Sequence, residues 1–170
     1  MEIRGYITNL GKYNEGQLIG EWIDFPITDS ELKDVLQRIG INEQYEEYFF
    51  TDWDSELDLY PVLGEYPRIA YVNEMAEKVE AFDDDDLLLA ATELWNLDEI
   101  LENGPNAYWL AADINTDEEL GYYWVEDSGC YDVKELGFLT NYIDYEALGR
   151  DIRLEANGDF TSYGWVEYMG

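Results

Sequence analysis

The pattern of apolar and polar residues in the first third of the chain predicts two strands, a helix and a third strand. Segments 3–8 and 18–25 are rich in β-branched and aromatic residues, and a glycine-bounded loop over 11–16 separates them, so a strand pair is expected. Apolar residues then recur at helical spacing over 28–40. The strand pattern returns over 48–53, which completes a ββαβ unit.

Capping residues indicate where several helices begin and end. Thr28 followed by Glu31 is typical of a capping box, and Gly40 is suitably placed to end that helix. The same spacing recurs at Asn96 and at Thr116, which predicts two further helices.

The middle of the chain is dominated by helical periodicity. Segment 69–82 carries apolar residues at helical spacing after two prolines. The aspartates at 83–86 precede the apolar segment 87–95, where the positive end of a helix dipole favours negative charge. A short strand is expected over 107–112.

The C-terminal quarter predicts one more helix and a hairpin. Apolar residues follow a helical period over 139–149, and the last residue of that range is a glycine suited to ending the helix. The dipeptide Asn157-Gly158 is typical of a tight turn, so strands are expected over 152–156 and 160–168.

These elements predict an α+β fold, arranged as an elongated chain of small domains. Residues 1–60 would form the N-terminal domain with the ββαβ unit, and residues 61–104 a helical acidic domain. Residues 105–170 would form a C-terminal α/β domain with a hairpin, which is also the candidate dimerisation region.

The composition combines extreme acidity with enough apolar material for a core. There are 40 Asp and Glu residues against 9 Lys and Arg and no His, which gives a net charge of −31. Such a charge opposes folding, but 46% hydrophobic and 16% aromatic residues predict a packed interior under a charged shell. With one cysteine, no leader segment, and Leu87–Ala91 as the longest apolar run, a cytoplasmic protein without membrane association is expected.

The acidic residues are segregated from the basic ones along the chain. No basic residue stands between Arg38 and Arg68 or between Lys78 and Lys134, and the second interval contains sixteen acidic residues. Most of these carboxylates must therefore stay hydrated at the surface, where a basic partner would relieve their repulsion. The candidate partner-binding surface consists of Glu43, Glu46, Glu47, Asp52, Asp54, Glu56, Asp58, Asp83, Asp84, Asp85, Asp86, Asp98, Glu99, Glu102, Asp113, Asp117, Glu118, Glu119, Glu126 and Asp127.

The sequence favours no catalytic or cofactor site. Without histidine, the usual nucleophilic triads and His-containing zinc sites are impossible, and a single cysteine excludes a four-cysteine zinc site. The acidic run that begins at Asp52 resembles a calcium loop, but Leu57 occupies its glycine position. We expect no enzyme, no metal and no cofactor. An acidic binding protein that imitates no other molecule, and that is either cation-binding or salt-adapted, remains the alternative hypothesis.

Three segments resemble the ArdA antirestriction family. They are YITNLGKYNEG at 6–16, followed by Gly20-Glu21-Trp22, then NEQYEEY at 42–48, and NYIDYEALGRD at 141–151. The resemblance covers nearly the whole chain and is looser over 66–129. It implies an antirestriction protein of mobile genetic elements, in the form of a homodimer that mimics bent B-DNA. Such a protein would occupy the DNA-binding groove of the methyltransferase core of type I restriction-modification enzymes, without binding nucleic acid itself.

The last of these segments is expected to serve the scaffold or the dimer rather than the partner. Tyr142, Ile143 and Ala147 have the spacing of a packed helical face, and Gly149 that of a helix stop. Arg150 is interpreted as an internal ion-pair partner.

Overall fold

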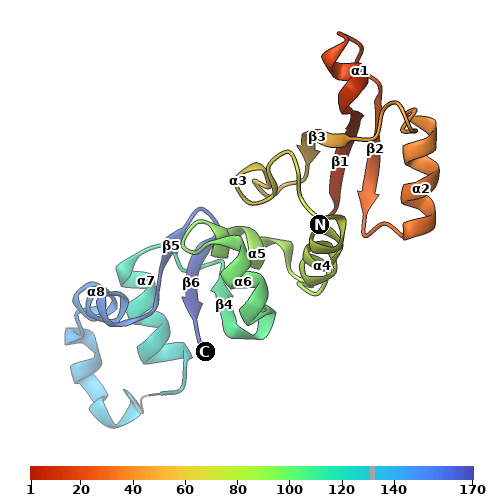
Figure 1. Cartoon of the computed structure of the whole chain (residues 1–170). Coiled ribbons are helices and arrows are strands. Elements are labelled where there is room, and N and C mark those ends of the chain that lie inside the picture. The colour runs from red at the N-terminus through yellow and green to blue at the C-terminus, as the bar shows by residue number, and fades with distance from the viewer. Residues whose placement is uncertain (131–132) are drawn as a thin grey trace. The chain divides into compact units, whose positions relative to one another are not determined.

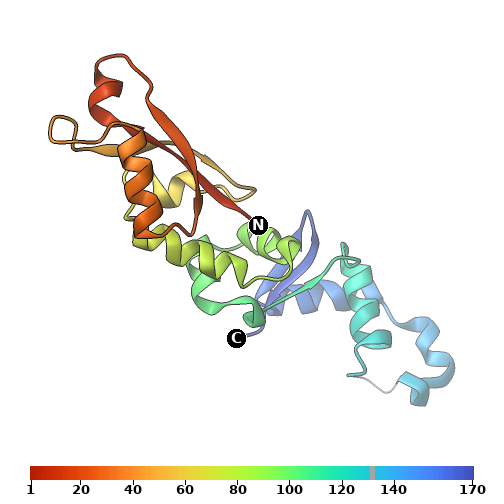
Figure 2. The ribbon, with the colours of Figure 1, turned by 90° about the vertical axis from the view of Figure 1, so that its right-hand side faces the viewer.

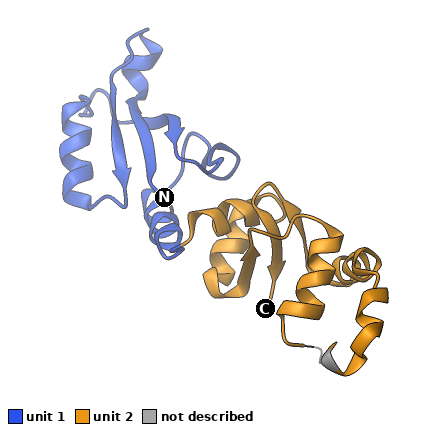
Figure 3. Ribbon diagram, turned by 180° about the vertical axis from the view of Figure 1, so that it is seen from behind, with its two compact units in different colours: residues 1–83 blue, residues 84–170 orange. Residues whose placement is uncertain are grey.

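A computed structural model gives the fold of residues 1–130 and 133–170 (Figure 1). The chain forms two compact units, residues 1–83 and residues 84–170 (Figure 3). Each unit combines helices with a three-stranded antiparallel sheet, which confirms the predicted α+β class. The division into three domains with boundaries at 60 and 104 stays a prediction.

The sheet of the first unit has the strand order β2-β1-β3. Strands β1 (Ile3–Asn9), β2 (Gly20–Phe25) and β3 (Tyr48–Asp54) are antiparallel, and the connection from β2 to β3 contains helix α2 (Asp29–Arg38). The predicted ββαβ unit is therefore confirmed. Helix α2 lies beside the strands in both views of the ribbon (Figures 1 and 2).

The capping residues of α2 act as the sequence predicts. The Thr28 side chain accepts a hydrogen bond from the Glu31 backbone N–H, and the Glu31 carboxylate accepts from the Thr28 backbone N–H. Gly40 follows the helix with a φ of 81°, in the left-handed region that favours glycine. The helix buries Val35 and the residue after it, Ile39.

Three further helices complete the first unit, and one of them replaces a predicted loop. The loop expected over 11–16 is wrong, because α1 (Leu10–Asn14) begins there with Asn9 as its N-cap. A buried asparagine that accepts from the N–H of Lys12 stabilises this short helix where the glycines alone suggested none. Helices α3 (Tyr60–Leu63) and α4 (Ile69–Glu80) follow β3.

Helix α4 is fixed to the end of β2 by one side chain. The Asn73 amide accepts from the Ile27 backbone N–H and donates to the Ile27 carbonyl, each at 2.8 Å. Val72, Met75 and Val79 of the same helix are buried. The apolar period over 69–82 therefore marks a packed face of the first unit, as predicted.

The second unit has a sheet of strand order β4-β6-β5, and its helices come before β4 and between β4 and β5 in the sequence. Its core contains Leu120 and Trp165, both fully buried, together with Ile114. Its elements are α5 (Asp85–Thr92), α6 (Leu97–Asn103), a short 3-10 turn (Pro105–Ala107), β4 (Tyr108–Ala111), α7 (Asp117–Tyr122), a π-helical turn (Tyr123–Asp127), a 3-10 segment (Val133–Tyr142), α8 (Tyr145–Glu155), β5 (Gly158–Thr161) and β6 (Gly164–Tyr168).

Two C-terminal predictions are wrong. The helix expected over 139–149 is divided, because Asp144 caps a new helix by accepting from the Ala147 N–H at 3.0 Å. The hairpin expected with its turn at Asn157-Gly158 instead joins β5 to β6 across 162–163, and residues 152–155 are helical. The turn dipeptide therefore separates a helix from a strand.

Helices α7 and α8 cross closely at two glycines. A Cβ atom on Gly149 would overlap the backbone carbonyl of Asp117, and one on Gly121 would overlap that of Tyr145. Gly149 is therefore not the predicted helix stop. It lies inside α8, where the lack of a side chain allows the two backbones to approach.

Candidate functional site

The acidic residues lie almost entirely on the surface of the two units. Asp132 lies outside the described residues, Glu21, Asp117 and Glu167 are half-buried, and all the other Asp and Glu residues are exposed. The hydrophobic core thus forms without burying negative charge, in agreement with the cost of removing a carboxylate from water. All members of the candidate partner-binding surface are exposed except Asp117.

The carboxylates of β3 and of the segment after it face outward, because exposed side chains alternate with less exposed ones along this part of the chain. Four acidic residues occupy every second position here: Asp52, Asp54, Glu56 and Asp58. Leu57 and Leu59, at the intervening and following positions, are buried. Asp54 also accepts a hydrogen bond from Arg4 at 3.3 Å, so part of its charge is compensated within the unit.

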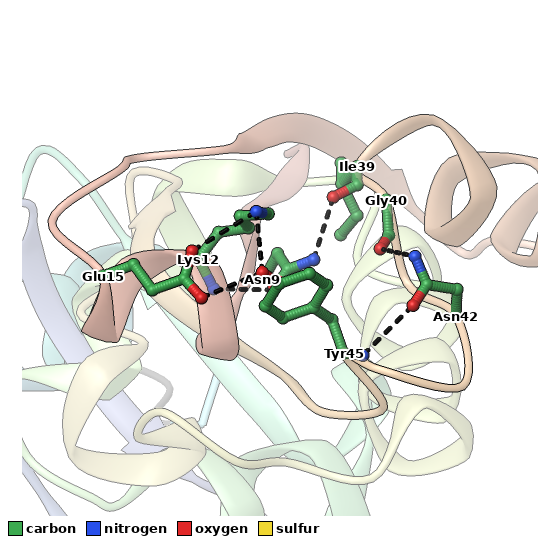
Figure 4. Close-up of polar contacts among 7 residues, drawn as sticks. All are labelled: Asn9, Lys12, Glu15, Ile39, Gly40, Asn42 and Tyr45. Carbon is green, nitrogen blue, oxygen red and sulfur yellow. Dashed lines mark hydrogen bonds and ion pairs between the residues drawn. The ribbon is translucent and has the colours of Figure 1, made fainter.

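The acidic segment 42–47 is anchored to α1 by a network around Tyr45 (Figure 4). The Lys12 ammonium donates to the Tyr45 hydroxyl at 2.8 Å, and that hydroxyl donates to the Glu15 carboxylate at 2.9 Å. The hydrogen bond with Tyr45 raises the pKa of Lys12 above its usual value and lowers the pKa of Glu15 below its own. Gly11 is required opposite the Tyr45 ring, because a Cβ there would overlap it.

Two asparagines hold the backbone on either side of this network (Figure 4). Asn9 is buried, accepts from the Lys12 N–H at 3.0 Å and donates to the Ile39 carbonyl at 3.1 Å. Asn42 donates to the Gly40 carbonyl at 3.1 Å and accepts from the N–H of Tyr45 at 3.2 Å. Residues of the first two resembling segments therefore have structural roles, and they hold Glu43, Glu46 and Glu47 toward solvent.

The acidic residues near the starts of α5 and α6 occupy positions that the helix dipole favours. Asp84 caps α5 by accepting from the Leu87 N–H at 3.2 Å, with Asp85 and Asp86 in the first turn. Asn96 caps α6 in the same way, and the first turn of that helix carries Asp98 and Glu99. These carboxylates stabilise their helices and stay exposed, so their structural and partner-binding roles are compatible.

Asp117 differs from the other members of the candidate surface. Its two carboxylate oxygens accept from the Arg153 guanidinium at 2.8 and 3.1 Å, which joins the start of α7 to α8. The hydrogen bonds from Arg153 hold the pKa of Asp117 below its usual value. Asp117 is therefore a structural ion-pair partner. Sequence reasoning missed Arg153, since no local pattern links it to a residue 36 positions away.

The residues assigned to the scaffold or dimer lie in different environments. Tyr142 is 79% exposed and ends the 3-10 segment, so it belongs to no packed helical face. Ile143 and Ala147 are half-buried and Gly149 is buried. Arg150 is exposed and forms an ion pair with its neighbour Asp151 at 3.4 Å.

Four of the candidate carboxylates line a cleft of about 780 Å³ in the second unit. Two tyrosines and the end of β4 complete its lining. The acidic residues are Asp113, Glu118, Glu119 and Asp127. Neither tyrosine was singled out as a site residue in the sequence.

Neither a cluster of metal ligands nor a membrane-spanning helix occurs in the part of the chain that the structure describes. Within residues 1–130 and 133–170, no three Asp, Glu or Cys side chains are grouped so that they could hold a metal ion. Among the same residues, no helix has the length and apolar character needed to cross a membrane.

Comparison with protein families gives one extensive match. The model of the antirestriction protein ArdA matches residues 5–167, nearly the full length of the chain. A search of curated proteins found no match. The family match includes all three segments in which the sequence resembles ArdA proteins. The chain therefore belongs to the ArdA antirestriction family.

Proposed function

We propose that this antirestriction protein is a DNA mimic that occupies the DNA-binding groove of a type I restriction-modification enzyme. The observation that carries the proposal is the outward placement of nearly all the described carboxylates on folded units that contain few cations. Occupying the groove makes and breaks no bond, so the proposed activity is not enzymatic. Its setting would be the cytoplasm of a bacterial host.

The amount of charge is sufficient to imitate a useful length of duplex. B-DNA carries one negative charge per about 1.7 Å of axis, so the net charge of −31 corresponds to about 53 Å, or about 15 base pairs. A groove lined with Lys and Arg for phosphate binding would meet about as much negative charge as that length of duplex carries. The folded core keeps the carboxylates in place, so little ordering is required on binding.

The direct test is competition for DNA on a purified methyltransferase core. We expect the protein to displace a labelled duplex, with an apparent affinity that weakens steeply as salt increases. Failure to displace the duplex even at low salt would refute the proposal of DNA mimicry. Tight stoichiometric calcium binding in calorimetry, without association to the restriction subunits, would instead support the cation-binding alternative.

We further propose that the functional form is a homodimer joined through the 3-10 segment Val133–Tyr142. This segment exposes large apolar side chains that a monomer would leave in water: Leu136 is 44% exposed, Phe138 74%, Leu139 50% and Tyr142 79%. A second copy of the chain is proposed to cover these apolar side chains, because a partner that binds through a basic groove would not need an apolar contact here. Two copies would also double the length of duplex that can be imitated.

The dimer is tested by light scattering coupled to gel filtration. Wild-type protein is expected at twice the mass of the chain, and Phe138→Asp with Leu139→Asp at the monomer mass. Tyr13→Asp with Leu18→Asp, which changes two exposed apolar residues of the first unit, is the matched control and is expected to stay dimeric. A monomeric wild type would contradict the proposal.

A further inference from the structure

The acidic cleft of the second unit is lined by carboxylates, tyrosine rings and apolar side chains. Helix α7 and the turn after it supply two Glu-Tyr pairs, each four residues apart: Glu118 with Tyr122, and Glu119 with Tyr123. Residues at this spacing lie on the same side of a helix, so each pair places a carboxylate and a tyrosine on one face. Tyr122 is 50% exposed, which leaves its ring accessible.

Another part of the cleft lining forms an apolar wall. It is formed by the end of β4 and the residues that follow, including Leu110, Ala111 and Ile114. Ile114 belongs to the core of the unit and is only 7% exposed, so this wall is part of a packed structure. Such a surface is suited to the aliphatic stem of a long basic side chain.

The charged side chains in the described lining of the cleft are all acidic. No Lys or Arg occurs in the described lining, whose ionisable carboxylates are Asp113, Glu118, Glu119 and Asp127. Arg150 and Arg153 of α8 form ion pairs with other carboxylates. Glu119 accepts the Asn115 N–H at 2.8 Å with one oxygen and has a second oxygen for a ligand.

We propose that this cleft receives an arginine side chain from the DNA-binding groove of the target enzyme. The inference rests on the proposed function and identifies one contact within it. The guanidinium lies among the carboxylates and against the tyrosine rings, and the side-chain stem lies on the apolar wall. Negative charge, aromatic rings and an apolar wall together complement arginine, whereas a smooth acidic surface would complement any cation.

Arginine fits these surroundings better than lysine does. A guanidinium is planar, stacks on aromatic rings and donates to a carboxylate through two parallel hydrogen bonds. An ammonium group is a compact and strongly hydrated charge that gains less from the rings. The cleft therefore adds selectivity to an interaction whose remaining contacts are mainly long-range electrostatics.

The first experiment tests the cleft without the restriction enzyme. N-acetyl-arginine amide is titrated into labelled full-length protein, and backbone NMR shifts are followed for each residue. We expect shifts concentrated at residues 110–114, 118–123 and 127, and much smaller shifts with N-acetyl-citrulline amide, which has a similar shape and no charge. Shifts of equal size at acidic residues throughout both units would overturn the proposal.

The second experiment measures the contribution of the cleft to inhibition. Glu118→Gln with Asp127→Asn is expected to weaken displacement of DNA by about tenfold or more, as for the loss of a charge-assisted hydrogen bond. The matched control, Glu146→Gln with Glu155→Gln, removes the same charge from exposed residues of α8 in the same unit and is expected to have a clearly smaller effect. Equal effects of the two pairs of substitutions would overturn the proposed arginine contact and leave the proposal of DNA mimicry unaffected.

A third variant separates stacking from charge. Tyr122→Leu keeps the net charge and an apolar surface but removes the ring, and it is expected to weaken both arginine binding and DNA displacement. If wild-type protein binds the arginine probe at the cleft but displaces no DNA, the proposed function fails and the cleft remains a cation-recognition site. If the protein displaces DNA and Tyr122→Leu changes neither readout, the role of the ring is refuted.

Discussion

The two units of the chain differ in how much of their charge is compensated. Residues 1–83 contain 19 acidic and 6 basic residues, whereas residues 84–170 contain 21 acidic and only 3 basic residues. In the first unit, Arg4, Lys12, Arg38 and Lys78 each form an ion pair with a carboxylate. The second unit therefore carries most of the net charge with fewer internal partners, and it also contains the acidic cleft.

The two units also differ in the contacts that stabilise them. In the first unit, residues of the resembling segments hold the chain through hydrogen bonds, as Asn9 and Tyr45 do. In the second unit, α7 and α8 are joined by close backbone packing at Gly121 and Gly149 and by the ion pair between Asp117 and Arg153.

The largest effect is expected from Gly149→Ala. Its new Cβ would overlap a backbone carbonyl of α7, which cannot move away as a flexible side chain can, so the cost is about 3 kcal/mol or more. Hydrogen exchange is expected to lose protection in residues 84–170 and to keep it in residues 1–83. Leu154→Ala, which changes a 70% exposed residue of the same helix, is the control and is expected to alter little.

The corresponding change in the first unit is Asn9→Ala. It removes the cap of α1 and leaves the Ile39 carbonyl without its side-chain donor, which costs about 2 kcal/mol in the free energy of unfolding. Urea unfolding measures this cost, with Asn14→Ala, an exposed asparagine of α1, as the control. Equal stabilities of the two variants would contradict the role of Asn9.

Added salt is expected to stabilise both units, and the second unit more than the first. Screening weakens repulsion among carboxylates, and this repulsion is stronger where fewer cations are present. Thermal melts monitored by residue-specific NMR signals would show the melting temperature rising with sodium chloride. A melting temperature that falls as salt is added would contradict the account of native self-repulsion.

The smallest effect concerns one tyrosine of the second unit. The hydrogen bond that Tyr145 donates to Glu126 raises the pKa of Tyr145 to about 12. The stabilising contribution of this bond is therefore present below the usual tyrosine pKa and is lost as pH rises through about 12. In Glu126→Gln the pKa is expected to fall toward 10.0, as measured by carbon NMR of the hydroxyl-bearing ring carbon. Asp127→Asn, which keeps the Glu126 acceptor, is the control.

Local patterns in the sequence predicted the features that depend on neighbouring residues. The capping box of α2 and the β-branched and aromatic content of the first strands involve residues that are close in the chain, so they can be recognised directly in the sequence. The surface position of the carboxylates could also be predicted, because the few cations cannot compensate them.

Other wrong predictions involve partners that are distant in the chain, whereas the missed caps at Asn9 and Asp144 are local. Gly149 was suited to a helix stop, but Asp117 and Gly121 from another helix determine its role. Asn157-Gly158 forms no hairpin turn, because α8 continues to Glu155 and β5 pairs with β6 through a later turn. The cleft was missed for the same reason, since only the folded unit brings Asp113 and Asp127 to one cavity.

The most direct measurement is the salt dependence of binding between this protein and the methyltransferase core of a type I enzyme. If the carboxylates replace DNA phosphates, the logarithm of the association constant falls steeply with the logarithm of the salt concentration, and bound protein excludes a DNA duplex. Association that is insensitive to salt, or a complex that contains both protein and duplex, would contradict the mimic.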